Sequence, residues 1–124
     1  MLFRLDFQSA MPIYRQIRDQ VVLAVAQGEL TPGERLPTTR ALAEDAGVNV
    51  MTVSKAYQLL KAEGYLATDR RAGAVVCAPR GKAAGLSADQ TARLNLLAGE
   101  ARLAGLTLED FLAACKAAFG ETED

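Results

Sequence analysis

The sequence contains no histidine and only two cysteines among its 124 residues. Histidine is the commonest general acid or base in enzymes, and together with cysteine it supplies most ligands of structural zinc sites. Cys77 and Cys115 lie 38 positions apart and are too few for such a site. The chain also lacks a G-x-S-x-G sequence and a phosphate-binding glycine loop. These absences predict a protein that is not an enzyme and that holds neither a metal nor a cofactor.

Long hydrophobic runs are also missing. The longest apolar run is the six-residue segment from Val21 to Ala26, whereas a helix needs roughly 20 such residues to cross a bilayer. The N-terminus shows no basic stretch followed by a long apolar core, as a secretory signal would. The sequence therefore predicts no membrane segment and a cytoplasmic location. In that setting the two cysteines are expected to be reduced and mostly buried, with a redox-sensing pair across a dimer as the alternative.

No strong excess of charge of one sign is present, because the 14 Lys and Arg residues and 15 Asp and Glu residues give a net charge of −1. Many nucleic-acid-binding domains are strongly basic, so the total argues weakly against such a partner. The distribution of charge along the chain, however, favours a nucleic-acid partner. Residues 48–80 hold five basic and two acidic side chains, whereas residues 81–124 hold four basic and seven acidic ones. Few cations per subunit also favour two subunits acting on one duplex.

Half of the residues are apolar, which is enough for one compact domain with an appendage. Small, flexible residues from Arg80 to Gly85 interrupt the pattern and predict a linker. We therefore divide the chain into a domain at residues 1–80 and a helical tail at residues 81–124.

Residues 36–63 have the pattern of a helix-turn-helix. Pro37 ends an extended run, and Thr38 or Thr39 is suited to cap a helix that begins near residue 39. Gly47 is suited to end it, because glycine tolerates left-handed backbone angles. Asn49 is a good cap for a second helix at about residues 50–63. A short turn between two helices is typical of DNA-binding domains of this kind.

The second of these helices has a buried and an outward face. Val53, Ala56, Tyr57 and Leu60 recur at helical spacing and predict the buried stripe. The outward residues include hydroxyl, amide and amine groups, which are the groups that read base edges in a major groove. They are Met51, Thr52, Ser54, Lys55 and Gln58.

Two short strands are predicted next, at residues 65–68 and 74–77. Arg70 and Arg71 fall in the connection between them, where they would meet phosphates or a minor groove. Helix, turn, helix and hairpin together predict a winged helix-turn-helix, with a wing at about residues 65–77. The predicted fold class is mostly α with this small β-wing, followed by a short two-helix C-terminal dimerisation element.

Several motifs resemble those of the GntR family of bacterial transcription regulators. They are Pro12-Ile13-Tyr14 with Gln16-Ile17, Pro32-Gly33-Glu34-Arg35-Leu36-Pro37-Thr38 with Arg40, Gly47-Val48-Asn49, Thr52-Val53-Ser54-Lys55-Ala56-Tyr57 and Glu63-Gly64. The match covers roughly residues 10–77, and the small helical tail resembles the YtrA-like subfamily. The resemblance implies a dimeric DNA-binding repressor in which Arg40, Thr52 and Ser54 contact DNA, with Lys55 beside them.

The chain departs from the family pattern at two places. Val50-Met51 stands where close relatives tend to have Pro-Asn, and Arg71-Ala72-Gly73 stands where Gly-Lys-Gly is more usual. An amide able to read adenine is thereby replaced by a thioether restricted to apolar contact, for example with a thymine methyl. The operator sequence therefore cannot be borrowed from relatives. The predicted DNA-binding residues are Thr38, Arg40, Asn49, Met51, Thr52, Ser54, Lys55, Arg70, Arg71 and Gly73.

The N-terminal segment is predicted to support this domain. Pro12 suits the first turn of a helix whose apolar positions recur at helical spacing until Gly28. Residues 1–10 alternate apolar and charged side chains, which predicts an edge strand.

Two helices are predicted in the tail. Ser87 and Gln90 form a capping pair for the first, which Gly105 ends, and Thr107 caps the second. Two such helices cannot bury their apolar faces alone, so they must cover another surface. We expect a second copy to cover them, while docking onto the chain's own domain remains the alternative. The predicted dimer interface consists of Leu94, Leu97, Ala101, Leu108, Phe111, Leu112 and Cys115.

The predicted function is sequence-specific regulation of transcription, and the family resemblance implies that the regulation is repression. A two-fold dimer presents two recognition helices to a palindromic operator on double-stranded DNA, with half-sites about 10 base pairs or a multiple apart. An unknown small-molecule effector would enter between the tails. The alternative is a winged-helix module that binds only protein, since fold alone does not fix function. The outward set of Arg40, Thr52, Ser54, Lys55, Arg70 and Arg71 distinguishes the two hypotheses.

Overall fold

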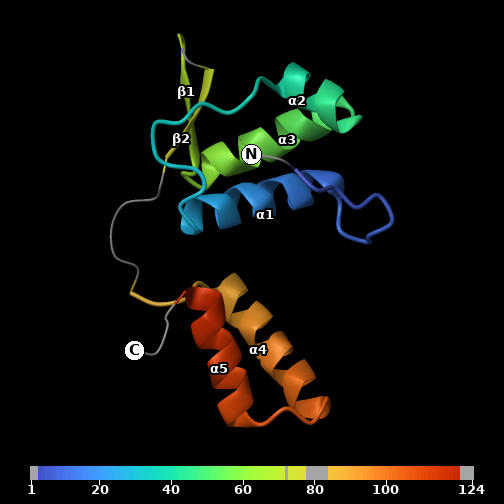
Figure 1. The fold of residues 1–124 in the computed structure, drawn as a ribbon, viewed down its shortest axis with the longest axis vertical. Coiled ribbons are helices and arrows are strands. Elements are labelled where there is room, and N and C mark those ends of the chain that lie inside the picture. Colours follow the sequence, from blue (N-terminus) through green and yellow to red (C-terminus); the bar gives the residue numbers. More distant parts are fainter. Residues whose placement is uncertain (1–2, 72, 78–83, 121–124) are drawn as a thin grey trace. The chain divides into compact units, whose positions relative to one another are not determined.

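The computed structural model describes residues 3–71, 73–77 and 84–120, so residues 80–83 of the predicted linker lie outside it. The chain divides into two compact units, Met1–Arg80 and Gly81–Asp124. The predicted class, mostly helical with a small antiparallel wing, is confirmed (Figure 1). The elements run in the order α1 (Ile13–Ala26), α2 (Thr39–Ala46), α3 (Val50–Ala62), β1 (Leu66–Asp69), β2 (Gly73–Val76), α4 (Ala88–Leu103) and α5 (Leu108–Phe119).

The core of the first unit is built around α3, which lies between α1 and α2 (Figure 1). The predicted buried stripe of α3 is confirmed, because its four residues are at most 4% exposed. Burying one large aliphatic side chain contributes about 1.5–3 kcal/mol, so this stripe holds the helix firmly. The largest fully buried side chains of the core are Ile17, Val21, Val53, Leu60 and Val76.

The turn between α2 and α3 is fixed by the predicted caps. The Thr38 side chain accepts a hydrogen bond from the Ala41 N–H at 3.0 Å, and the side-chain Oδ1 of Asn49 accepts one from the Met51 N–H at 2.7 Å. Gly47 follows α2 with φ 69° and ψ 35°, a left-handed conformation that other residues rarely adopt. These local interactions set where α3 begins, and hence which of its residues form the first turn.

The wing is a two-stranded antiparallel sheet with Leu66 opposite Val76 and Asp69 opposite Gly73. Its strands lie one residue nearer the hairpin turn than predicted. The difference arises because Gly73, at φ 75°, closes the hairpin against Asp69. The extended segment 33–36 pairs with the other edge of β2, where the Val76 N–H donates to the Glu34 carbonyl at 2.7 Å. This pairing anchors the wing to the chain that leads into α2.

The predicted edge strand in residues 1–10 is wrong for the described part of that segment, residues 3–10. Two glutamine side chains of α1 take the place of a neighbouring strand. The Gln20 side chain accepts from the Arg4 N–H at 2.9 Å and donates to the Arg4 carbonyl at 2.7 Å. Gln16 does the same for Asp6, at 2.8 and 2.9 Å. The alternating pattern remains meaningful, because Phe3 and Leu5 pack against the core.

An ion pair joins α1 to the end of α3. The Arg18 guanidinium donates to both carboxylate oxygens of Glu63, at 2.8 and 3.2 Å, and to Asp19 at 2.8 Å. Burial opposes the charge of Arg18, but the hydrogen bonds that it donates to the two carboxylates outweigh this effect and raise the pKa of Arg18. Glu63 is the C-terminal cap residue of α3, so this fork fixes one end of the helix.

Tyr57 joins α3 to the chain entering α2. Its hydroxyl donates to the Pro37 carbonyl at 2.7 Å, and burial raises the pKa of Tyr57 to about 12. Ionisation of this phenol would leave a buried charge facing a carbonyl oxygen.

Alkaline unfolding is expected to depend on Tyr57. The folded-state pKa of about 12 lies above the value of 10.0 for an unperturbed phenol, so the stabilisation is complete below pH 10 and is lost as the pH rises to about 12. The loss amounts to about 2–3 kcal/mol. The free energy of unfolding measured in urea should therefore fall more steeply with pH over this range for the wild type than for Tyr57→Phe. Tyr65→Phe serves as the matched control, and equal slopes for wild type and Tyr57→Phe would contradict the prediction.

The second unit is a pair of antiparallel helices (Figure 1). The predicted capping box at Ser87 and Gln90 is present, and the Thr107 side chain accepts from the Asp110 N–H at 3.1 Å. Neither helix contains a buried residue. Cys115 is exposed and Cys77 half-buried, so the expectation of mostly buried thiols is wrong for Cys115. Among the described residues, none of the helices has the length and hydrophobicity needed to span a bilayer.

Candidate nucleic-acid interface

The start of α3 presents most of its predicted outward residues to solvent. Met51 is 72% exposed, and Lys55 and Gln58 are exposed as well. Thr52 and Ser54 are half-buried and thus less exposed than the other three, so their hydroxyl groups lie at the edge of the exposed surface of α3. None of these side chains is occluded, and hydroxyl, thioether and ammonium groups share the first two turns of the helix.

Arg40 occupies the first turn of α2 and is exposed. In the described part of the chain it takes part in no ion pair, so its guanidinium is available to an external anion. Thr38 and Asn49 are also exposed, but each uses its side-chain oxygen to cap a helix. The hydroxyl hydrogen of Thr38 and the amide NH₂ of Asn49 are left as donors, which suits them to phosphate oxygens rather than to reading a base.

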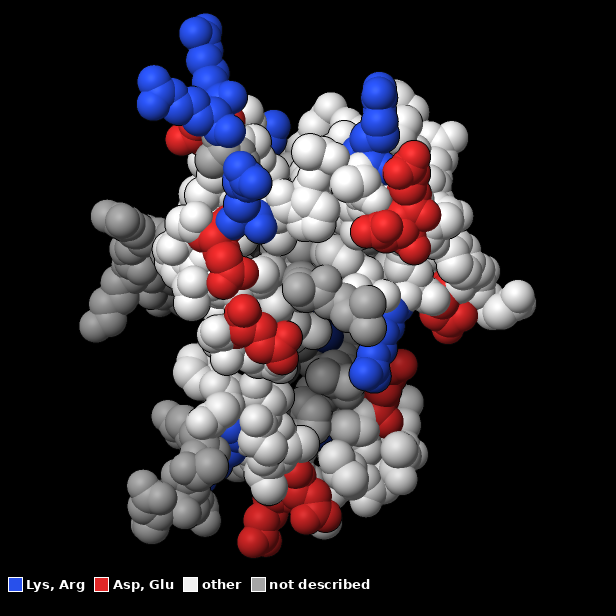
Figure 2. Space-filling model, turned by 45° about the horizontal axis from the view of Figure 1, so that its top comes forward, with Lys and Arg blue, Asp and Glu red and all other residues white. Residues whose placement is uncertain are grey.

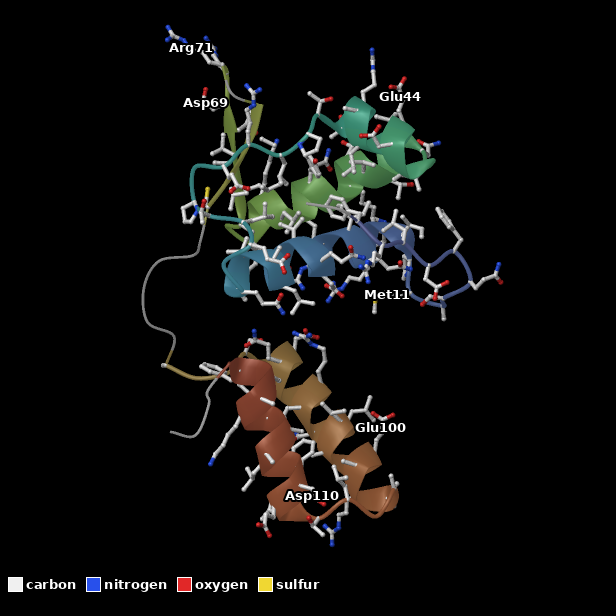
Figure 3. The ribbon with its side chains drawn as sticks, in the orientation of Figure 1. Met11, Glu44, Asp69, Arg71, Glu100 and Asp110 are labelled. Carbon is white, nitrogen blue, oxygen red and sulfur yellow. The ribbon has the colours of Figure 1, made fainter. Side chains whose placement is uncertain are left out.

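The tip of the wing carries Arg70 and Arg71, which are both exposed. The Asp69 carboxylate accepts a hydrogen bond from the Arg71 backbone N–H at 2.7 Å and so stabilises the turn. Arg71 extends from the end of the hairpin, away from the three helices (Figure 3). Neither arginine belongs to an ion pair of the described residues. Gly73, which was predicted to contact DNA, has the structural role of closing the hairpin.

The positive charge of this unit is local. Figure 2 shows basic side chains projecting from the wing, and another basic side chain over α2 with acidic side chains beside it. Glu44 of α2 is among the exposed acids (Figure 3). On the face shown in Figure 2, the exposed cations at the wing and at the start of α2 therefore form separate points instead of one continuous patch.

Arg35 is an exposed cation that the sequence reasoning did not single out. It lies in the segment that pairs with the wing, where it forms a bridge with Val75 of β2. The sequence signal was its place next to Leu36 at the end of an extended run. That signal gave no indication of the pairing, because the partner lies 40 positions away.

Lys55 has a partner that the sequence reasoning also missed. Its ammonium nitrogen lies 4.1 Å from the centre of the Tyr14 ring of α1. Ammonium groups are attracted to the negative face of an aromatic ring at this distance. Lys55 is therefore directed towards α1, whereas the other predicted contact residues of α3 have no aromatic partner of this kind in the described residues.

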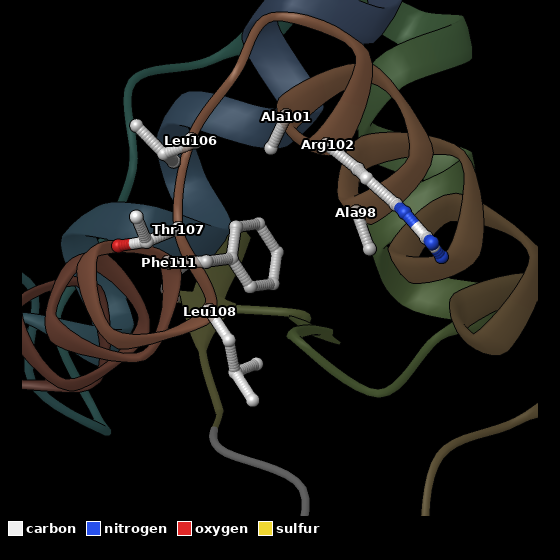
Figure 4. A pocket seen from close by; sticks show the side chains of 7 residues that line it. All are labelled: Ala98, Ala101, Arg102, Leu106, Thr107, Leu108 and Phe111. Carbon is white, nitrogen blue, oxygen red and sulfur yellow. The ribbon is translucent and has the colours of Figure 1, made fainter.

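The predicted dimer-interface residues divide between two sides of the tail hairpin. Phe111 and Ala101 are half-buried and face the space between α4 and α5, where they line a cavity of about 430 Å³ with Ala98 and Leu106 (Figure 4). The cavity wall is mostly apolar and includes Arg102 and Thr107. Leu108 also lines this cavity (Figure 4), although it is 73% exposed. The remaining predicted residues are exposed as well, and they are Leu94, Leu97, Leu112 and Cys115.

A family model described as bacterial regulatory proteins of the gntR family matches residues 13–76. The chain is 36% identical over 107 residues to the HTH-type transcriptional regulator Rv1152 of Mycobacterium tuberculosis, and the alignment covers 86% of this chain and 85% of that protein. It is 39% identical over 75 residues to the HTH-type transcriptional repressor YtrA of Bacillus subtilis, covering 60% of this chain and 58% of that protein. The chain thus spans less than two thirds of YtrA.

Solved structures of transcription regulators are also similar to this chain. YtrA from Sulfolobus acidocaldarius, a GntR-family transcription factor, is 35% identical with a TM-score of 0.63, over 82% of this chain and 99% of that one. The DNA-binding domain of AraR in complex with operator ORX1 is 26% identical with a TM-score of 0.54, over 60% of this chain and 96% of that one. The segment that the family model matches, residues 13–76, includes the whole helix-turn-helix and wing described above.

Proposed function

Because the chain belongs to the GntR family of bacterial regulatory proteins, whose model it matches over residues 13–76, we propose that it represses transcription as a homodimer on a palindromic operator. The chain itself is a DNA-binding transcriptional regulator of the winged helix-turn-helix class. The proposal concerns its assembly, the form of its operator, the direction of regulation and the residues that contact DNA.

The observation that carries the proposal is the exposed start of α3 with Arg40 of α2 and the wing arginines on the same unit. In a helix-turn-helix the second helix lies in the major groove and its N-terminal residues meet the base edges. Thr52 and Ser54 supply hydroxyl groups there, and Met51 supplies an apolar contact. Arg40 suits a guanine edge or a phosphate, since a guanidinium binds either in a bidentate manner. Arg70 and Arg71 would follow the backbone or enter the minor groove.

The homodimer is supported by the apolar surface of the second unit. Leu103 is 91%, Phe119 87% and Leu108 73% exposed, and neither helix of this unit buries a residue. At about 25 cal/mol for each Å² of apolar surface, leaving such side chains in water is unfavourable. A second copy would cover the same faces on both hairpins in an isologous four-helix interface. Such a dimer also doubles the number of cations that reach one duplex.

Repression is supported by the name of YtrA from Bacillus subtilis, a transcriptional repressor that shares 39% of the aligned residues. A dimer that occupies two successive major grooves covers about 20 base pairs, which is enough to exclude another protein from the same promoter segment. We further propose that a small effector enters the cavity between α4 and α5. It would regulate binding only if it favours one spacing of the two recognition helices over the other.

A selection of bound duplexes from random DNA tests the proposed operator. We expect the recovered duplexes to share an inverted repeat with half-sites about 10 base pairs apart. Placing that duplex between a promoter and a reporter gene should lower reporter expression when the chain is present. Recovery of no shared sequence would contradict specific DNA binding and would favour a winged-helix module that binds protein. A single half-site without a repeat would contradict the dimeric mode, and raised expression would contradict repression.

A further inference from the structure

We propose that Tyr14 of α1 is a positioning residue for Lys55, holding its ammonium at the rim of the major groove, where it contacts a DNA phosphate and not a base. The inference rests on the proposed function, because it takes α3 as the helix that enters the groove. It assigns Tyr14 a part in DNA binding and changes the role expected for Lys55 from reading bases to binding the backbone.

The direction of the Lys55 side chain indicates which part of the DNA its ammonium would meet. Its ammonium lies 4.1 Å from the centre of the Tyr14 ring, and that ring belongs to α1 and not to the recognition helix. A side chain drawn towards a neighbouring helix is drawn away from the axis of the groove. In a helix-turn-helix the N-terminal residues of the recognition helix meet the base edges, and Lys55 lies more than one turn beyond the start of α3 with its ammonium on the side of α1. The ammonium is therefore placed where phosphates, and not base edges, are expected.

The chemistry of the partner carries the second step. Arg18, the other basic side chain that contacts across α1 and α3, is paired with the carboxylates of Glu63 and Asp19, which cancel its charge. The partner of Lys55 is a neutral ring. A ring orients the ammonium through its quadrupole without cancelling its charge. A phosphate that approaches from the open side meets a full positive charge that is already in position.

The packing of Tyr14 carries the third step. Tyr14 is half-buried and packs against the core, whereas Lys55 is exposed. The ring is therefore held in place by its own packing, and it can orient the lysine. A free lysine loses much rotamer freedom on binding, and a fixed ring removes part of that loss beforehand. Lysine suits this task, because its ammonium is a compact point charge that binds phosphate without a required bidentate geometry.

A double-mutant cycle on the full chain tests the proposal. The variants are Lys55→Met, Tyr14→Leu, Tyr14→Phe and the combination of Lys55→Met with Tyr14→Leu. Affinity is measured against salt concentration on the selected operator and on a scrambled duplex of equal length. We expect Lys55→Met to weaken binding to both duplexes by the same factor and to lower the salt slope by about one for each protomer.

Tyr14→Leu is expected to weaken binding to both duplexes about two- to five-fold per protomer, as loss of an exposed ammonium–ring contact should. Tyr14→Phe keeps the ring face and should bind like the wild type. In the Lys55→Met background, Tyr14→Leu should have no further effect. A structural role for Tyr14 would weaken binding equally in both backgrounds, so additive effects would overturn the proposal. Loss confined to the operator would also overturn it, because that result identifies Lys55 as a base reader.

A spectroscopic measurement keeps the proposal testable if Tyr14→Leu does not fold. The ε-methylene protons of Lys55 should be shifted upfield by the ring current in the wild type and in Tyr14→Phe, both free and bound to the operator. Random-coil shifts of these protons in the free protein would show that Lys55 does not contact the ring. Random-coil shifts only in the DNA complex would show that the ring does not hold Lys55 when DNA is bound. Failure of the wild type to bind any selected duplex would instead contradict the proposed function itself.

Discussion

Replacing Arg40 with alanine should weaken binding to the selected operator by roughly 1 to 3 kcal/mol for each protomer, which is the range for loss of a specific arginine contact. The folded domain should hardly change, because Arg40 is exposed on the first turn of α2 and belongs to no ion pair of the described residues. Electrophoretic or fluorescence titration of the operator measures the first effect, and thermal unfolding measures the second.

Two further variants separate the possible roles of Arg40. Arg40→Lys keeps the charge and removes the planar fork, so it should restore binding only if Arg40 contacts a phosphate. Arg93→Ala is the matched control, because Arg93 is an exposed helical arginine of α4 whose partner is Asp89 at 3.2 Å. An exposed pair of this kind contributes little, so this variant should bind and unfold like the wild type. Unchanged operator affinity in Arg40→Ala would contradict the assignment of Arg40 to the interface.

The features of the fold that depend on neighbouring residues could be predicted from the sequence. Thr38 and Asn49 cap their helices through hydrogen bonds two or three positions along the chain. Gly47 ends α2 because of its own backbone freedom. The stripe of α3 follows from helical periodicity alone. These local rules placed the candidate contact residues on the correct elements and faces.

The features that the sequence did not predict are contacts between distant segments. The glutamines that hold residues 4–6 lie on α1, 10 to 16 positions away, and periodicity contains no information about such clamps. An alternating pattern was therefore interpreted as a strand. The pairing of Lys55 with Tyr14 spans 41 positions, so the same lysine could be assigned to a face but not to a direction. In the candidate site, the element on which each residue lies was predictable and the orientation of the Lys55 side chain was not, and the DNA contacts themselves stay predictions.

Two aspartates on the exposed face of α5, at Leu108 and Leu112, should convert the proposed dimer into monomers. The side chains of Leu108 and Leu112 are 73% and 51% exposed in the protomer. Leu108 also lines the cavity between α4 and α5, but its exposure lets a carboxylate at this position remain in water. In a four-helix interface the same charges would be buried without partners, which is strongly unfavourable. Phe111 is left unchanged because it faces Ala98 and Ala101 of α4, and its replacement would damage the hairpin itself (Figure 4). Sedimentation equilibrium measures the mass directly.

Operator binding should fall by about 100-fold or more in the double aspartate variant, because each recognition helix then binds its half-site without the effective concentration that a linked partner provides. Binding to an isolated half-site should change little, which separates loss of assembly from damage to the DNA-binding unit. Ala113→Asp is the control for an added carboxylate, since it places one such charge one position beyond Leu112 on a different face of α5. Intact dimers in the double variant would show that these leucines lie outside the interface. Monomers that keep full operator affinity would show that DNA binding does not need the dimer.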